Sequence, residues 1–201
     1  EMSVAGLDFF NPESTTNFPT EDPNAIIDEL VDDQRVRRLM DRYQADVVHF
    51  IGAENPTVCG LAFVATDFNV SDNLVNRVSG AAGAGYTALS CTGTGTVAHE
   101  VGHNFGLNHD RYTLADAASG GGGDQEDYHI PYGFIEDSGR FYTTMSYGGV
   151  CRSEFGSGAA CRDEAAYSSP DLVDSNFGLP MGKAASAIDA ADASTAAQRS
   201  S

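Results

Sequence analysis

The sequence predicts a single domain of mixed α+β or α/β class, with an upper lobe over about residues 1–106 and a lower lobe over about residues 107–201. A length of 201 residues suits one domain. Helical periods and short apolar runs alternate in the first half of the chain, which predicts a small mixed sheet with helices. Gly-rich and Ala-rich stretches in the second half predict mostly irregular structure and a C-terminal helix.

The upper lobe is expected to open with an extended arm, because residues 1–24 hold three prolines and no sustained period. Asp22 followed by Pro23 is a helix-start signal. Apolar residues then recur at helical spacing as far as Gln44, which predicts one bent helix or two short ones. The remaining predicted elements are strands over 47–51, 61–65 and 86–90, and a helix over 94–105.

The lower lobe contains one stretch that is too rich in glycine and acid to pack. Residues 119–127 are interpreted as a solvated surface loop. The alternative is a calcium site, since carboxylate oxygens of Asp124, Glu126 and Asp127 are suitable ligands. The Ala-rich segment 183–198 predicts the closing helix.

The charge balance excludes several classes of partner. Lys plus Arg is 11 and Asp plus Glu is 29, which gives a net charge of −18. Binding to nucleic acid or to anionic lipid needs clustered cations, so neither is expected. No apolar run approaches the roughly 18 residues of a membrane span. No basic segment followed by an apolar one opens the chain, so we expect any signal peptide or pro-segment to have been removed.

The four cysteines predict two disulfides and an oxidising, secreted location. Their number is even and none belongs to a C-x-x-C pair. Of the three possible pairings, the local one is favoured because short loops close most easily, and it joins Cys59 to Cys91 and Cys151 to Cys161. The alternative is four buried free thiols in a cytosolic protein.

A histidine-rich segment carries the predicted chemistry. His99 and His103 are one helical turn apart, so both imidazoles can face one ion. Glu100 lies beside them and can reach a water without binding the ion. Gly106 can take positive φ and turn the chain so that His109 becomes a third ligand. Three protein ligands with an open position are typical of a catalytic zinc site.

These residues form the pattern H-E-x-x-H-x-x-G-x-x-H, and a Met-turn around Met145 follows it. On this basis the chain resembles the metzincin zinc endopeptidases, over roughly residues 36–198. It is most similar to the secreted, bacterial-type relatives of the adamalysin/reprolysin family, because Asp110 matches the H-D ending of the reprolysin motif. Weaker similarities lie in segments 44–48, 59–62, 139–141 and 167–170.

The resemblance implies a zinc-dependent endopeptidase that acts on proteins or peptides, expected as a monomer. In it Glu100 is the general base, Met145 forms a hydrophobic floor under the zinc ligands, and Asp110 supports the third histidine rather than binding zinc. Tyr147 is a fifth zinc ligand or an oxyanion donor, or else a buried aromatic bonded elsewhere. His49 is interpreted as a core histidine.

An extended substrate is expected to pair with an exposed strand edge, at residues 59–65 or 86–90. Residues after Met145 are expected to build a side-chain pocket, with the loop between Cys151 and Cys161 at its rim. Two alternatives stay open: a catalytically silent binding protein of the same fold, and a zinc amidase acting on a non-protein substrate. A silent protein would be expected to lose one of the site residues, whereas this sequence keeps all of them.

Overall fold

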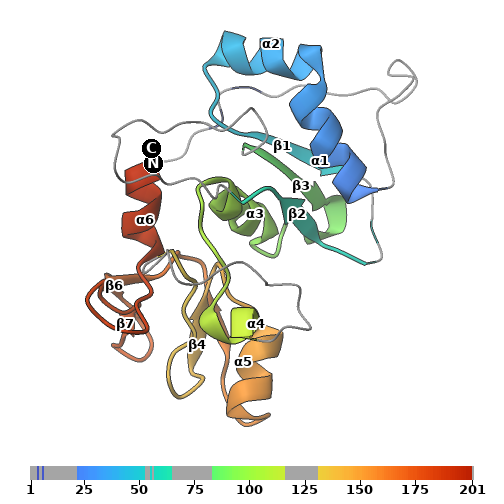
Figure 1. The fold of residues 1–201 in the computed structure, drawn as a ribbon. Helices are drawn as coiled ribbons and strands as arrows, with labels where there is room; N and C mark the ends of the chain where they lie inside the picture. Colours follow the sequence, from blue (N-terminus) through green and yellow to red (C-terminus); the bar gives the residue numbers. More distant parts are fainter. Residues whose placement is uncertain are drawn as a thin grey trace. The chain divides into compact units, whose positions relative to one another are not determined.

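A computed structural model of the chain describes residues 22–52, 55, 57–64, 83–115 and 131–200, together with residues 4 and 6 (Figure 1). Most of the predicted arm (all but residues 4, 6 and 22–24) and the whole 119–127 loop with its calcium alternative lie outside the described residues. The chain divides into two compact units, Glu1–Asn104 and Phe105–Ser201. In the part of the chain that the structure describes, no helix has the length and apolar character to cross a membrane.

The first unit begins with two helices, α1 over Pro23–Asp32 and α2 over Gln34–Tyr43. The helical period does not form one bent helix, because Asp33 is extended and caps α2. Its side chain accepts hydrogen bonds from the backbone N–H groups of Arg35 and Val36, at 2.5 and 3.1 Å. The predicted start is confirmed, since the Asp22 carboxylate accepts from the N–H of Asn24 at 3.0 Å.

A three-stranded mixed sheet follows, made of β1 (Val48–Gly52), β2 (Gly60–Ala62) and β3 (Ala84–Ala88). Its order is β1-β3-β2, with β3 parallel to β1 and antiparallel to β2. The prediction that residues 86–90 could offer a substrate-binding edge is therefore wrong. Residues 84–88 are the paired centre of the sheet, and Leu89–Cys91 leave it as the 3-10 helix η1. Among the described strands, β2 remains at an edge.

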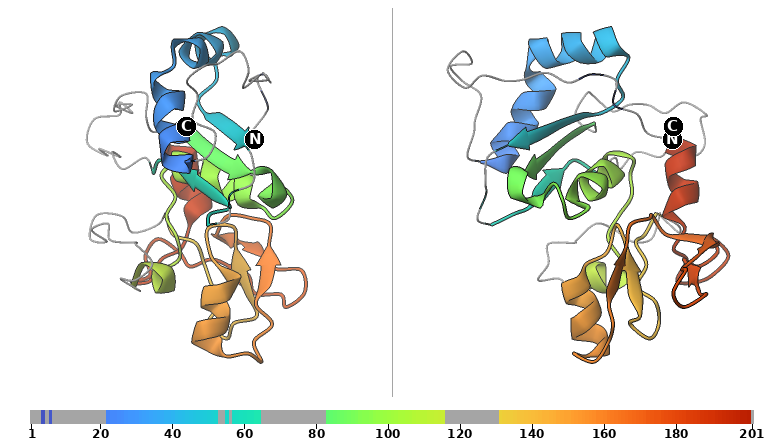
Figure 2. Two further views of the ribbon diagram at one scale, coloured as in Figure 1. Left: turned by 90° about the vertical axis from the view of Figure 1, so that its right-hand side faces the viewer. Right: turned by 180° about the vertical axis from the view of Figure 1, so that it is seen from behind.

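Successive side chains along β3 point to opposite faces of the sheet. One face packs on α1, and its buried apolar core consists of Ile26, Ile27, Leu30, Val36, Ala84, Tyr86 and Ala88. Gly85 and Thr87 face the other way, toward the helix α3 (Thr96–Asn104). The ribbon shows α1 and α3 on opposite faces of the sheet (Figure 2). Each fully buried Ile or Leu contributes roughly 1.5–3 kcal/mol, so this core fixes the sheet on which α3 rests.

Both disulfides have the local pairing that loop closure favours. Cys59 is bonded to Cys91 with Cα atoms 5.5 Å apart, and Cys151 to Cys161 with Cα atoms 5.8 Å apart. The first lies in unit 1 and joins the residue before β2 to the end of η1. The second lies in unit 2, where it closes a loop after α5 (Gly148–Phe155).

The second unit contains two small sheets that the sequence does not predict. They pair β4 with β5 in parallel and β6 with β7 antiparallel. The bounds are α4 Arg111–Ala115, β4 Phe141–Thr143, β5 Arg162–Glu164, β6 Ser169–Val173, β7 Pro180–Met181 and α6 Ala193–Ser200. Strands of two to five residues are too short to show a period of two.

The closing helix is shorter than predicted, since α6 begins only at Ala193. Lys183 and Ala191 exchange two backbone hydrogen bonds of 2.9 Å, which closes the intervening residues into a turn. The Lys183 ammonium also binds the carboxylates of Asp137 and Asp189, at 2.9 and 2.5 Å. The Ala-rich composition of 183–192 favours a helix, but these contacts outweigh that preference.

Candidate metal centre

The helix α3 carries the first two histidines of the motif. His99 and His103 are both buried, at 7% and 5% exposure, and their rings meet edge to face with centroids 4.9 Å apart. The spacing of four residues places them on one side of the helix, as the sequence predicts. Both imidazoles therefore lie side by side, close enough for one nitrogen of each ring to reach a common ion.

The third histidine follows a sharp turn at Gly106, which has a φ of 77°. A side chain at that φ would be strained, so the turn explains the glycine. The chain then runs beside residues 131–133: Asn108 N–H donates to the Pro131 carbonyl at 2.7 Å, and Gly133 N–H donates to the Asn108 carbonyl at 3.0 Å. His109 is therefore held on a fixed backbone directly after this pairing.

Nitrogen atoms of His99, His103 and His109, one from each ring, all lie within 4.8 Å of one another. Imidazole nitrogen is a preferred zinc donor, with bonds of about 2.0–2.1 Å, so the donor set fits zinc. No other group of three or more His, Cys, Asp or Glu side chains gathers this closely in the described ranges.

Glu100 is almost fully buried, at 6% exposure. Burial disfavours its ionised form and raises the pKa of the carboxyl from 4.5 to about 8. A cation held by the neighbouring histidines would lower that pKa again. Gly60 of β2 lies against this side chain, since a Cβ atom at residue 60 would lie 2.5 Å from Oε1 of Glu100. Sequence reasoning singled out the segment 59–62 for its family likeness, but not this contact.

Polar contacts also fix the C-terminal end of α3 to the sheet. The Asn104 amide donates to the carbonyls of Phe63 and Ala84, at 3.0 and 2.9 Å. On the same face, Nε2 of His49 lies 2.8 Å from the hydroxyl of Thr87. Burial lowers the pKa of His49 to about 4, so this histidine is neutral and structural. The role of Asn104 depends on strands far away in sequence, and no local signal could have revealed it.

Tyr147 lies beside the third histidine. Its hydroxyl is 2.8 Å from Nε2 of His109, and the two rings are 4.9 Å apart. The residue is 41% exposed, so it is not the buried aromatic that one alternative described. Because Tyr147 is extended and immediately precedes α5, its side chain is placed by the start of that helix.

Asp110 acts on the backbone beside His109. Its carboxylate accepts from the N–H and the hydroxyl of Thr113, at 2.9 and 2.7 Å, which caps α4. The side chain is 1% exposed. Burial raises its pKa, although both hydrogen bonds from Thr113 act in the opposite direction. This buried cap fixes the backbone directly after His109.

Met145 is fully buried and packs with Leu107 and Ala193. Leu107 belongs to the segment between His103 and His109, so the methionine contacts the turn that carries the third histidine. The Met-turn is closed by a 2.8 Å hydrogen bond from Ser146 N–H to the Thr143 carbonyl. Gly133 lies so close to the Met145 carbonyl that a Cβ there would be 2.6 Å from the oxygen.

Comparison with known proteins agrees with this geometry. Residues 1–110, more than half of the chain, match the family described as metallo-peptidase family M12B, reprolysin-like. A search among curated protein sequences finds no match. One similar solved chain, from the "Structure of a chaperone-substrate complex", has 22% identity and a TM-score of 0.55 over 92% of this chain. The present chain spans 25% of that chain, and the likeness concerns the fold alone.

Proposed function

Because the chain belongs to the reprolysin-like M12B metallopeptidase family, we propose that it is a secreted zinc endopeptidase that cleaves internal peptide bonds of proteins, acting as one catalytic domain. One observation carries the proposal: three histidine nitrogens lie within 4.8 Å of one another. A buried carboxyl, Glu100, stands next to the first of these histidines on the same helix. The two disulfides support a secreted location.

In this proposal His99, His103 and His109 hold the metal. A zinc ion there would supply Lewis-acid chemistry, acidifying a water molecule and polarising the scissile carbonyl. The protein orients the ligands: Asn104 fixes α3 to the sheet, and Asp110 fixes the backbone beside His109. A site held this firmly needs little reorganisation during the reaction.

Glu100 is the general base. Its buried carboxyl takes a proton from the attacking water and later passes it to the leaving amine. Only the ionised carboxylate accepts a proton, and a cation held by the neighbouring histidines would favour that form against the effect of burial, which raises the pKa. The Tyr147 hydroxyl, beside His109, donates a hydrogen bond to the oxyanion that develops on the carbonyl oxygen.

Substrate binding is assigned to the edge strand β2. An extended peptide would pair with the backbone of Gly60–Ala62, so that main-chain hydrogen bonds supply affinity. Residues after Met145 would build a side-chain pocket, with the Cys151–Cys161 loop at its rim. The contact between Gly60 and Glu100 supports this assignment, because it places the strand beside the proposed base.

Metal dependence tests the proposal. Purified protein should cleave casein or gelatin, lose activity after treatment with a chelator, and recover it with about one equivalent of Zn²⁺. Replacing His109→Ala should abolish both recovery and tight zinc binding. Cleavage that persists in the fully metal-free protein would contradict the proposal. A zinc-loaded protein that cleaves no peptide or protein would instead favour a binding role or a narrow non-protein substrate.

A further inference from the structure

The backbone of Gly60 lies directly against the proposed general base. A Cβ atom at this position would be 2.5 Å from Oε1 and 2.7 Å from Cγ of Glu100. It would also be 2.7 Å from the Cγ2 methyl of Thr96. Both contacted side chains belong to α3, so the first residue of β2 touches the zinc-motif helix where Glu100 projects from it.

We propose that Gly60 is a positioning residue for Glu100, and that the Cys59–Cys91 disulfide holds it in place. The inference rests on the proposed function, in which Glu100 is the base. It assigns to residue 60 a role beyond pairing with substrate: its missing side chain leaves the space that the Glu100 carboxyl occupies.

The glycine is needed for space rather than for backbone conformation. Gly60 is not among the glycines with positive φ, so a residue with a Cβ could adopt its backbone angles. The added Cβ would instead crowd the neighbouring side chains of Glu100 and Thr96. Contacts below about 3 Å require a neighbour to move, and the end of the Glu100 side chain is more mobile than the backbone of a strand. Alanine at residue 60 is therefore expected to fold and to displace the carboxyl.

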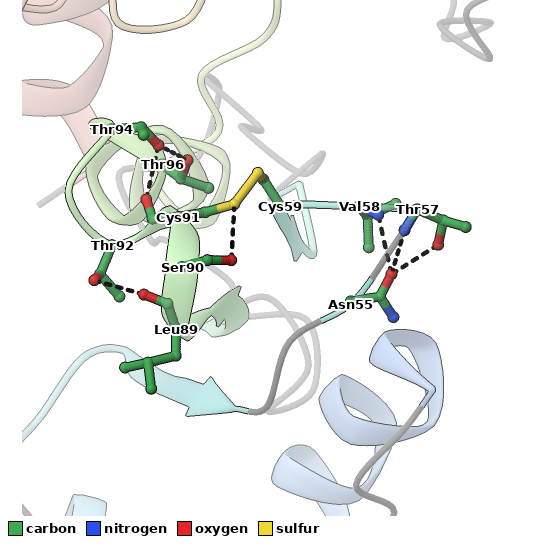
Figure 3. Close-up of a disulfide and its surroundings, with 10 residues drawn as sticks. All are labelled: Asn55, Thr57, Val58, Cys59, Leu89, Ser90, Cys91, Thr92, Thr94 and Thr96. Carbon is green, nitrogen blue, oxygen red and sulfur yellow. Dashed lines mark hydrogen bonds between the residues drawn. A yellow bond between two sulfur atoms is a disulfide. The ribbon is translucent and has the colours of Figure 1, made fainter.

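The Cys59–Cys91 disulfide links the residue before Gly60 to the turn before α3; Figure 3 shows this disulfide with Thr94 and Thr96. On one side, Ala88 N–H donates to the Cys59 carbonyl at 2.8 Å, which places Cys59 and Gly60 at the sheet. On the other side, the Thr94 hydroxyl donates to the Cys91 carbonyl at 2.7 Å and lies 2.8 Å from the hydroxyl of Thr96. The covalent link thus runs from the residue before Gly60 to the turn that starts α3.

Displacement of Glu100 should affect turnover more than binding. A general base must lie within hydrogen-bond reach of the proton that it accepts. A shift of about 1 Å in a reacting group can cost on the order of 100-fold in rate. The three atoms nearest to a Cβ at residue 60 belong to Glu100 and Thr96 and not to the three histidines, so we expect metal binding to be retained.

The test compares Gly60→Ala with two matched glycine variants in the zinc-loaded enzyme, using a peptide substrate. We expect kcat to fall by about 100-fold, with KM and zinc content nearly unchanged. Gly93→Ala meets nothing within 4 Å and should behave as wild type. Gly52→Ala meets the rings of Tyr86 and Phe50, at 2.7 and 2.8 Å, so it perturbs the same sheet without touching Glu100. It should lower thermal stability but not kcat.

A second variant relieves the crowding. Thr96→Ser removes the methyl that faces residue 60 and keeps the hydroxyl that meets Thr94. The double variant Gly60→Ala/Thr96→Ser should recover part of the lost kcat, because the new Cβ can lean away from Glu100. If Gly60→Ala lowered kcat only by destabilising the fold, adding Thr96→Ser would not raise kcat again.

The disulfide is tested by Cys59→Ser/Cys91→Ser, which removes the covalent link between the residue before Gly60 and the turn before α3. We expect this variant to have a lower kcat than wild type at equal zinc content, and this measurement tests the inference if Gly60→Ala does not fold. Wild-type kcat in folded, zinc-loaded Gly60→Ala, or in folded, zinc-loaded Cys59→Ser/Cys91→Ser, would overturn the inference and leave the peptidase function standing. A zinc-loaded wild-type protein without hydrolytic activity would overturn both.

Discussion

The hydroxyl of Tyr147 lies 2.8 Å from Nε2 of His109. Both residues belong to the second unit, and each is held by its own helix, since Tyr147 precedes α5 and Asp110 beside His109 caps α4. The tyrosine hydroxyl therefore lies directly beside the third histidine of the motif. This contact supports the proposed role of Tyr147 as an oxyanion donor, which its exposure alone would not suggest.

Replacing Tyr147→Phe should lower kcat and leave the fold intact. Loss of one oxyanion donor costs about 100- to 1000-fold in kcat. The side chain is 41% exposed, so the free energy of unfolding should change little. Steady-state kinetics and thermal unfolding measure the two effects. An unchanged kcat would remove Tyr147 from the mechanism, and a loss of zinc binding would make it a ligand instead.

Asp110→Ala should weaken zinc binding through the backbone. The variant removes the cap of α4 and leaves the N–H and hydroxyl of Thr113 without this acceptor. Loss of a cap costs about 1 kcal/mol, and loss of a supporting carboxylate typically lowers metal affinity by about 10- to 100-fold. Zinc titration against a competing chelator measures the change. Asp110→Asn keeps an accepting oxygen and should retain more affinity, so equal losses in both variants would contradict the capping role.

The partly buried His49 makes stability depend on pH. Its pKa is lowered from 6.5 to about 4 in the folded protein, so the folded state binds fewer protons than the unfolded state between these values. The free energy of unfolding is therefore highest above pH 6.5 and falls as the pH drops toward 4, by at most about 3 kcal/mol. Denaturant unfolding across this range should show the loss in wild type and a smaller loss in His49→Gln. If the free energy of unfolding fell equally with pH in wild type and His49→Gln, other groups would be the cause of the loss.

Removing the second disulfide should affect stability more than activity. Cys151 and Cys161 are ten residues apart, and Cys151 is fully buried in a small apolar cluster with Ile135. Opening such a loop costs roughly 2–4 kcal/mol. We expect Cys151→Ser/Cys161→Ser to lower the denaturant midpoint while kcat stays near the wild-type value. A large fall in kcat would show that this loop contributes directly to the active site.

Local sequence signals predicted the metal centre better than they predicted the second unit. The spacing of His99, His103 and His109 and the turn at Gly106 are set by helix geometry and by one backbone angle, and the three nitrogens gather as the motif implies. The helix α5 was not predicted, because it opens with Gly148 and Gly149, which disfavour helices.

Contacts between distant segments account for what could not be predicted. Asn104 binds carbonyls of Phe63 and Ala84, and Gly60 faces Glu100, and each contact exists only once the sheet has formed. For the same reason, the sequence could not decide whether residues 59–65 or 86–90 form the substrate-binding edge. Both segments are apolar and short, and only the strand order shows that β3 is central and β2 lies at an edge among the described strands.

The most direct test of the central claim is proteolysis of casein by wild type and by Glu100→Gln, with zinc counted in both proteins. The variant is nearly isosteric and cannot accept a proton as the carboxylate does. The account predicts about one zinc per chain in both proteins and cleavage by wild type alone, with kcat reduced by at least about 100-fold in the variant. Equal cleavage by both zinc-loaded proteins would contradict it.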